Sequence, residues 1–392
     1  MGAYGPALPG PNHDRGRGSG PSASQGHARN GPHRYFGHVH NHGSRVRRFN
    51  FLSPTTGYAV RFGTAVSAAI WLGKVPGLVS SHSSWILITV LVLMQPSAQG
   101  TMLKTLFRLI GTPAAAGSAI LLFGLYSQDP PQLMAAFFAI QAIAAYGYSG
   151  SRFQYAWFVW GFTTAIVLGD ALAGEGAVET VAFERASMVA IGAVLVFVVD
   201  ALSMTVWSEP QPQESPAPPQ PFWPVRLDPI RMKIGIRTGI AVTLTMLIQL
   251  VLGWPVDTLV APVAFMVAVS PTRNSLFEKM AGLGIAILLG WIVADFAIVY
   301  LTPDVGRAPA ALVIPFAIAA TFAGVSAGRP LLAILPSIGG VVALLPVFGE
   351  ASPPTDVYGT YNTVCNMALA VVVAGLCART FWPQNDPTPT SV

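Results

Sequence analysis

The sequence predicts an all-α integral membrane protein with about twelve transmembrane helices, arranged as two parallel six-helix repeats. Of its 392 residues, 52% are hydrophobic and only 10% are charged, which leaves too little polar surface for a water-soluble globule of this size. Apolar runs long enough to cross a hydrocarbon core of about 30 Å recur along the chain. The second half of the chain also repeats chemically distinctive residues of the first half.

The apolar runs are bounded by glycine, proline or charged residues. In the first half we expect spans at 57–73, 84–98, 107–126, 131–148, 153–172 and 184–207. In the second half we expect them at 234–253, 257–270, 280–301, 309–328, 330–348 and 358–381. The second and eighth runs are short and stop at Pro96 and Pro271. Because proline removes a backbone donor, each of these two is expected to be a broken or partly re-entrant helix.

The evidence for the repeat is an alignment of Arg, Pro, Lys, Asp and Trp residues, which unrelated apolar helices seldom share in one register. The segment RFGTAVS at 61–67 aligns with RTGIAVT at 237–243, after which one residue is lost. Beyond that point Pro96 falls on Pro271, Lys104 on Lys279, Asp129 on Asp304 and Trp207 on Trp382. With six spans in each copy, both copies enter the membrane in the same direction. This predicts parallel repeats related by an axis along the membrane normal.

Composition divides the chain into five segments. Residues 1–50 are rich in Gly, Pro, Ser, His and Arg and predict a disordered, basic, histidine-rich cytoplasmic tail, whose histidines we expect to be solvated rather than to form a metal site. The six-span units occupy 51–207 and 230–382. Residues 208–229 between them form a proline-rich linker of polyproline II character. Residues 383–392 form a short C-terminal tail.

The distribution of positive charge predicts the orientation of the chain. With the N-terminus in the cytoplasm and twelve spans, most of the 22 basic residues fall on the cytoplasmic side, and both termini are cytoplasmic. Asp170, Glu175 and Glu179 are then expected in outer loops. The positive net charge is thereby explained by topology, and no nucleic-acid partner is predicted.

No motif of a known enzyme class is present. The chain has no HExxH, no GxSxG, no phosphate-cradling loop and no paired cluster of metal ligands. Cys365 and Cys377 lie in one apolar run and are expected to be packing residues. The sequence therefore predicts no enzyme, no metal site and no cofactor.

Two arginines in predicted spans are candidate substrate ligands. An ionisable group inside a span costs about 2.5–3.5 kcal/mol, so it is expected to face a cavity or a partner. Arg61 and Arg237 occupy equivalent places near the cytoplasmic ends of spans one and seven, and guanidinium groups bind carboxylates well. The alternative is that each side chain snorkels to the inner headgroups.

The proline elbows are a second kind of candidate site. A helix that restarts after Gln95-Pro96 or after Ser270-Pro271 directs free backbone donors and a positive dipole end at the elbow, where an anion can bind. Ser275 and Glu278 have the spacing of a capping box after the second elbow. The alternative is that these prolines only kink the helices.

Two aspartates in predicted spans, Asp200 and Asp295, are candidates for proton coupling, because desolvation favours the protonated form of a carboxylate. The alternative is a structural ion pair, for example of Asp200 with Arg61 or Arg237.

The aromatic stretch RFQYAWFVWGF at 152–162 offers rings for stacking on an aromatic substrate. We favour an interfacial belt for this stretch, because it should meet the inner headgroups.

Several of these residues resemble the signature of a known family. The matching residues are Trp85, Thr89, Gln95-Pro96, Lys104, Arg108-Leu-Ile-Gly111-Thr112 and Gly117. They are similar to the fusaric acid resistance and aromatic acid exporter family of bacterial inner-membrane proteins. Glu184-Arg185, Gly192 and Trp207 resemble the end of the same six-span unit.

The resemblance implies a proton-driven exporter of small, often aromatic, carboxylic acids in the bacterial inner (plasma) membrane. In Gram-negative hosts such exporters work with a periplasmic adaptor protein. Two departures limit this inference. The second unit has Leu283, Ala286 and Ile287 in place of Arg108, Gly111 and Thr112. Longer family members also carry a soluble domain between the halves, where this chain has only its linker.

Together these observations predict a secondary transporter that exports small organic anions. The substrate carboxylate is expected to meet Arg61, Arg237 and the Gln95-Pro96 elbow, with Lys104 and Arg108 drawing anions from the cytoplasm. One alternative is a passive anion channel with a ring of these cations. Another is a membrane scaffold subunit of a larger complex. Whether the protein forms a homo-oligomer is left open by the sequence.

Overall fold

The structure is a computed structural model that describes residues 53–75, 83–174, 176–206, 227–253, 259–301, 308–349 and 358–381. The predicted tails and nearly all of the predicted linker lie outside these ranges. Within them the regular structure is entirely helical. In the described part of the chain, eight helical segments are long and apolar enough to cross a membrane, so the chain is a multi-pass membrane protein. The arrangement of twelve spans in two repeats stays a prediction.

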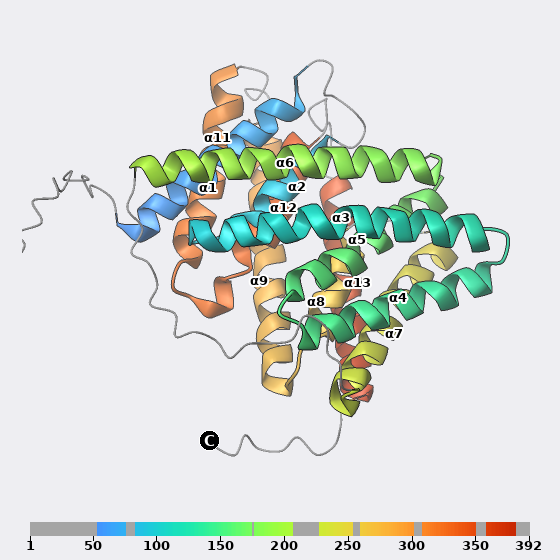
Figure 1. The fold of residues 1–392 in the computed structure, drawn as a ribbon. Coiled ribbons are helices and arrows are strands. Elements are labelled where there is room, and N and C mark those ends of the chain that lie inside the picture. Colours follow the sequence, from blue (N-terminus) through green and yellow to red (C-terminus); the bar gives the residue numbers. More distant parts are fainter. Residues whose placement is uncertain are drawn as a thin grey trace, which may run out of the picture. The chain divides into compact units, whose positions relative to one another are not determined.

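The helices occur in the order of the predicted runs, although several begin earlier than predicted (Figure 1). The first half contains α1 (Pro54–Gly73), α2 (Ser84–Leu93), α3 (Ala98–Tyr126), α4 (Pro130–Gly150), α5 (Gln154–Leu172) and α6 (Val178–Val206). The second half contains α7 (Pro229–Leu252), α8 (Val260–Ala268), α9 (Arg273–Phe296), η1 (Ala297–Leu301), α11 (Ala308–Ser326), η2 (Pro330–Leu332), η3 (Leu335–Gly339), α12 (Gly340–Phe348) and α13 (Tyr358–Thr380).

The two short helices end just before the predicted prolines. Helix α2 has 10 residues and α8 has 9, so each spans roughly 15 Å, about half of a hydrocarbon core. After the first break α3 begins at Ala98, well before the expected residue 107, because the Ser97 hydroxyl accepts from the Gly100 N–H and caps the helix. Lys104 and Arg108 therefore both lie on α3.

The second break is capped in a different way from the one expected. Helix α9 begins at Arg273, and its capping box joins Thr272 and Ser275, whose side chains accept from each other's backbone N–H. The predicted pairing of Ser275 with Glu278 is wrong because the helix begins one turn earlier than that pairing requires.

The most extensive contacts between the two halves are the crossings of α1 with α11 and of α4 with α7. Each crossing has a glycine where the backbones approach closely. A Cβ on Gly63 would lie 2.9 Å from the carbonyl oxygen of Phe316, and a Cβ on Gly239 would lie 3.0 Å from that of Phe138. Small residues allow membrane helices to pack this closely. Within the first half α6 packs on α2 and α3, and within the second half α13 packs on α8 and α9.

Replacing Gly235 by alanine is expected to destabilise the α4–α7 crossing. A Cβ at this position would lie 2.7 Å from the carbonyl oxygen of Ala142, so the helices must separate. We expect the free energy of unfolding to fall by about 1–3 kcal/mol, as for other overpacked sites. Thermal unfolding of the purified protein in detergent measures this. Gly284→Ala on α9 is the matched control, because its Cβ meets open space; equal melting temperatures for the two variants would contradict the prediction.

Candidate anion-binding site

A cavity of about 750 Å³ lies between the two halves of the chain. All of its aromatic lining residues come from the first half: Tyr58, Trp85, Tyr148, Tyr155, Phe158 and Phe162. Its wall from the second half is aliphatic, with residues such as Leu259, Met266, Leu283, Ile334 and Val341. Of the predicted site residues, Gln95, Pro96, Lys104 and Arg108 all line it. A largely apolar cavity with a few polar groups is the usual form of a small-molecule site.

The charged side chains of the cavity wall are all positive. Lys104 and Arg108 come from α3, Lys279 comes from α9, and Arg329 comes from the turn after α11. The described lining contains no aspartate and no glutamate. Such a wall favours anions over cations and neutral molecules.

Arg108 is the most deeply buried of these cations, with 1% of its surface exposed. Its Nη1 donates to the Tyr155 hydroxyl at 3.4 Å, and its guanidinium carbon lies 5.3 Å from the centre of the Phe162 ring. Its Nε finds no acceptor among the described residues. Arg108 also forms no ion pair with any described carboxylate. This guanidinium therefore retains capacity for an anionic ligand.

Two lysines hold the ends of the short helices in similar ways. The Nζ of Lys104 donates to the Val92 carbonyl at 3.4 Å and lies 5.1 Å from the centre of the Tyr155 ring. The Nζ of Lys279 donates to the Met266 carbonyl, also at 3.4 Å. Both carbonyls belong to the last turns of α2 and α8, where a helix leaves its carbonyls unsatisfied. Both ammonium groups thereby stay at the cavity wall.

The aromatic stretch on α5 faces inward over part of its length. Tyr155, Phe158 and Phe162 line the cavity, so the interfacial belt is wrong for these three rings. Phe158 packs on Phe162 with centroids 4.7 Å apart and on Phe265 of the other half at 5.4 Å. Their spacing along a helix places them on one face, and that face meets α8 rather than headgroups.

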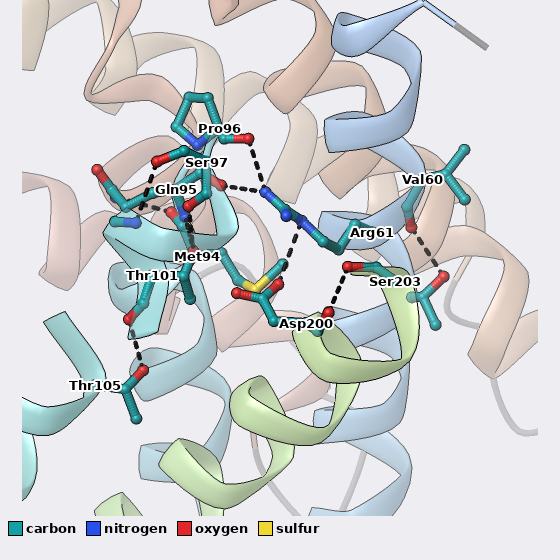
Figure 2. Close-up of polar contacts among 12 residues, drawn as sticks. Val60, Arg61, Met94, Gln95, Pro96, Ser97, Thr101, Thr105, Asp200 and Ser203 are labelled. Atoms are coloured by element: carbon teal, nitrogen blue, oxygen red, sulfur yellow. Dashed lines mark hydrogen bonds and ion pairs between the residues drawn. The ribbon is translucent and has the colours of Figure 1, made fainter. Parts of the chain in front are cut away.

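Arg61 is buried behind the first elbow rather than in the cavity wall (Figure 2). Its Nη2 donates to the carbonyls of Gln95 at 2.5 Å and Pro96 at 2.8 Å, and its Nε lies 3.3 Å from Oδ1 of Asp200 on α6. Arg61 is 3% exposed and Asp200 is fully buried. The ion-pair alternative for Asp200 is confirmed, and snorkelling is wrong for Arg61 because its donors turn inward to the elbow.

Arg237 repeats this arrangement in the second half. Its Nε donates to the Ala268 carbonyl at 2.9 Å and its Nη2 to the Ser270 carbonyl at 2.7 Å, at the end of α8. It is 2% exposed, so snorkelling is wrong here too. Arg237 does not line the cavity, and neither does Asp295, which lies half-buried on α9. The structure thus brings Arg61 and Asp200 together and leaves Asp295 apart from the other predicted site residues.

A second buried ion pair was not predicted. Asp170 in the last turn of α5 pairs with Arg185 in α6, and both are almost completely buried. The outer-loop placement of Asp170 is wrong, because the pair lies between the two helices. The guanidinium carbon of Arg185 lies 4.4 Å from the ring centre of Trp85, which lines the cavity. The sequence signal for this ion pair is that Asp170 and Arg185 carry opposite charges and lie on either side of the short connection between α5 and α6.

Replacing Asp170 by asparagine is expected to lower the free energy of unfolding by about 3–5 kcal/mol, because it breaks the buried ion pair with Arg185 by removing one of its two charges. Thermal unfolding in detergent measures the effect. The double variant Asp170→Leu/Arg185→Met is expected to recover most of the loss, since no buried charge is left unpaired. A single variant as stable as the wild type would contradict this account of the pair.

One comparison with known proteins gives a match, and this match covers most of the first half of the chain. Residues 64–199 match the profile of the family described as fusaric acid resistance protein-like. Neither the curated proteins nor the solved structures give a significant match. The matched residues run from α1 to α6 and include Trp85, Arg108, Asp170 and Arg185. The resemblance is therefore confirmed for residues 64–199, which carry a fusaric acid resistance protein-like region.

Proposed function

We propose that the protein is a secondary transporter that exports small organic anions, aromatic carboxylic acids in particular, driven by the proton gradient. The observation that carries this proposal is the cavity wall, which joins aromatic rings to Lys104, Arg108 and Lys279 without a described carboxylate. Rings stack on rings, and guanidinium groups bind carboxylates. The apolar helices and the family match support a membrane transporter as the general class.

In this proposal the carboxylate of the substrate binds Arg108 and Lys104, and its ring packs against Tyr155, Phe158 and Phe162. The Gln95-Pro96 elbow closes one side of the cavity. We assign Arg61 and Arg237 a supporting role in place of direct contact, because both are engaged with backbone carbonyls at the elbows.

We further propose that the two halves are parallel six-span repeats that rock about the cavity during transport. Three pairs of contacts support this arrangement. Arg61 and Arg237 bind the carbonyls at the ends of α2 and α8, and Lys104 and Lys279 bind carbonyls one turn earlier. Gly63 and Gly239 occupy matching positions in the two crossings between the halves.

For proton coupling we propose Asp200, with Asp295 as the second candidate. Asp200 pairs with Arg61, and Arg61 holds the elbow whose residues line the cavity. A proton on Asp200 would neutralise the carboxylate that pairs with Arg61 and would thereby change how Arg61 holds the elbow. The geometry thus offers a direct route from protonation to the substrate site. We retain the bacterial inner membrane, with cytoplasmic termini and a periplasmic adaptor, as the proposed setting.

The test is uptake of a labelled hydroxybenzoate into everted vesicles that contain the protein, with and without a proton gradient. We expect accumulation above the passive level that collapses with a protonophore. Asp200→Asn should still bind the substrate but lose the stimulation by the gradient, provided that its unfolding shows an intact fold. Flux that only follows the anion's own gradient would favour the channel, and no saturable movement would overturn the proposal.

A further inference from the structure

We propose that the cavity without its organic substrate holds a small monovalent inorganic anion of the halide class at Arg108, and that the substrate displaces this anion. The inference rests on the cavity used in the proposed function but not on transport or on its energy source. It adds a ligand and a competition that the export proposal does not require.

The first argument is the charge of Arg108. An arginine keeps its proton in a protein, and removing the partner of a buried charge costs several kcal/mol. Arg108 is 1% exposed, and its Nε meets no described acceptor. Its contacts, the Tyr155 hydroxyl and the face of Phe162, carry no formal charge. An anion in the adjoining cavity would supply the missing charge.

The second argument comes from the other half of the chain. Leu283 occupies the place that corresponds to Arg108, and it lines the same cavity. An aliphatic side chain of similar reach is therefore compatible with this position in the fold. The second half thus builds its part of the cavity wall without a charge at this place, which supports a ligand-binding role for Arg108.

The third argument concerns the class of anion. The Tyr155 hydroxyl accepts from Arg108, so its own proton remains available to an anion, and the Lys104 ammonium lies 5.1 Å from the same ring. The rest of the nearby wall is apolar, with Phe158, Phe162 and other side chains that cannot replace a hydration shell. A weakly hydrated monovalent anion loses less on entering such a site than sulfate or phosphate does.

The experiment is thermal unfolding of the purified full-length protein in bromide and in sulfate at equal ionic strength. We expect bromide to raise the melting temperature of the wild type saturably, relative to the same salt series applied to Arg108→Leu, which reports the general effect of each salt on stability. Arg108→Leu should lose this rise, yet melt in sulfate no lower than the wild type, because its buried charge is gone. Arg108→Lys should keep part of the rise, and Arg152→Leu, which changes an exposed arginine outside the cavity wall, should keep all of it.

Wild type and Arg108→Leu that respond alike to bromide would overturn the inference. A loss of stability in Arg108→Leu that is the same in both salts would assign the residue a structural role and also overturn it. In the wild type, bromide should raise the apparent Kd of labelled hydroxybenzoate in proportion to its concentration. If hydroxybenzoate binds and bromide does not change its Kd, the anion inference is wrong and the proposed substrate stands. If bromide stabilises the protein and hydroxybenzoate does not bind, the proposed substrate is wrong and the anion inference stands.

Discussion

Replacing Arg108 by glutamine is expected to weaken the binding of a labelled hydroxybenzoate by about 10- to 100-fold. The variant keeps a polar side chain but loses the charge-assisted contact to the carboxylate, which is worth about 1.5–3 kcal/mol. Equilibrium binding to the purified protein in detergent measures the change. We expect the substitution to leave the rest of the fold intact, because the only hydrogen bond of Arg108 to a described residue is the one to the Tyr155 hydroxyl.

The control for this prediction is Arg152→Gln, which removes the same charge outside the cavity wall and should bind as the wild type does. Arg108→Lys should fall between the two, because an ammonium retains the charge but not the fork of donors. If Arg108→Gln and Arg152→Gln bind equally well, the carboxylate does not meet Arg108.

Replacing Arg61 by leucine is expected to lower the free energy of unfolding by roughly 5 kcal/mol or more. The change leaves Asp200 charged and buried and removes the donors to the Gln95 and Pro96 carbonyls. This is the opposite of what we expect for Arg108, although both are deeply buried arginines in adjacent parts of the fold. Thermal unfolding in detergent should rank the Arg61 variant far below Arg108→Leu.

The double variant Arg61→Leu/Asp200→Leu separates the two causes. It removes the buried Asp200 carboxylate as well as Arg61, but it does not restore the donors to the Gln95 and Pro96 carbonyls, so it should recover part of the loss and not all of it. Complete recovery would show that Arg61 stabilises the protein only through Asp200. An Arg61→Leu protein as stable as the wild type that no longer binds substrate would restore Arg61 as a direct ligand.

The helices could be predicted because their signals are local. The lengths of the helices follow from the runs of apolar residues. The breaks at Pro96 and Pro271 follow from the missing backbone N–H of proline. The equivalence of Arg61 and Arg237 could also be predicted, because the residues that follow each of them align in the two halves. What these arginines bind was not visible, because their acceptors are carbonyls more than thirty residues away, which any sequence supplies.

The cavity could be predicted only in part. Gln95, Pro96, Lys104 and Arg108 were found because they are unusual in an apolar chain. Tyr58, Tyr148 and the aliphatic wall were missed, because lining a cavity depends on how two distant halves pack. Asp170 was misplaced for a related reason, since a residue near a helix end can face either water or a partner helix, and only packing against Arg185 decides between them.

The unlike walls of the cavity give it a direction. One half contributes the aromatic rings with Lys104 and Arg108, and the other contributes Lys279, Arg329 and aliphatic side chains without an aromatic ring. A molecule that carries a ring, an acid group and an alkyl chain therefore fits best in one pose and not in the reverse one. We expect positional isomers of equal mass and charge, such as ortho- and para-substituted benzoates, to differ in how well they occupy it.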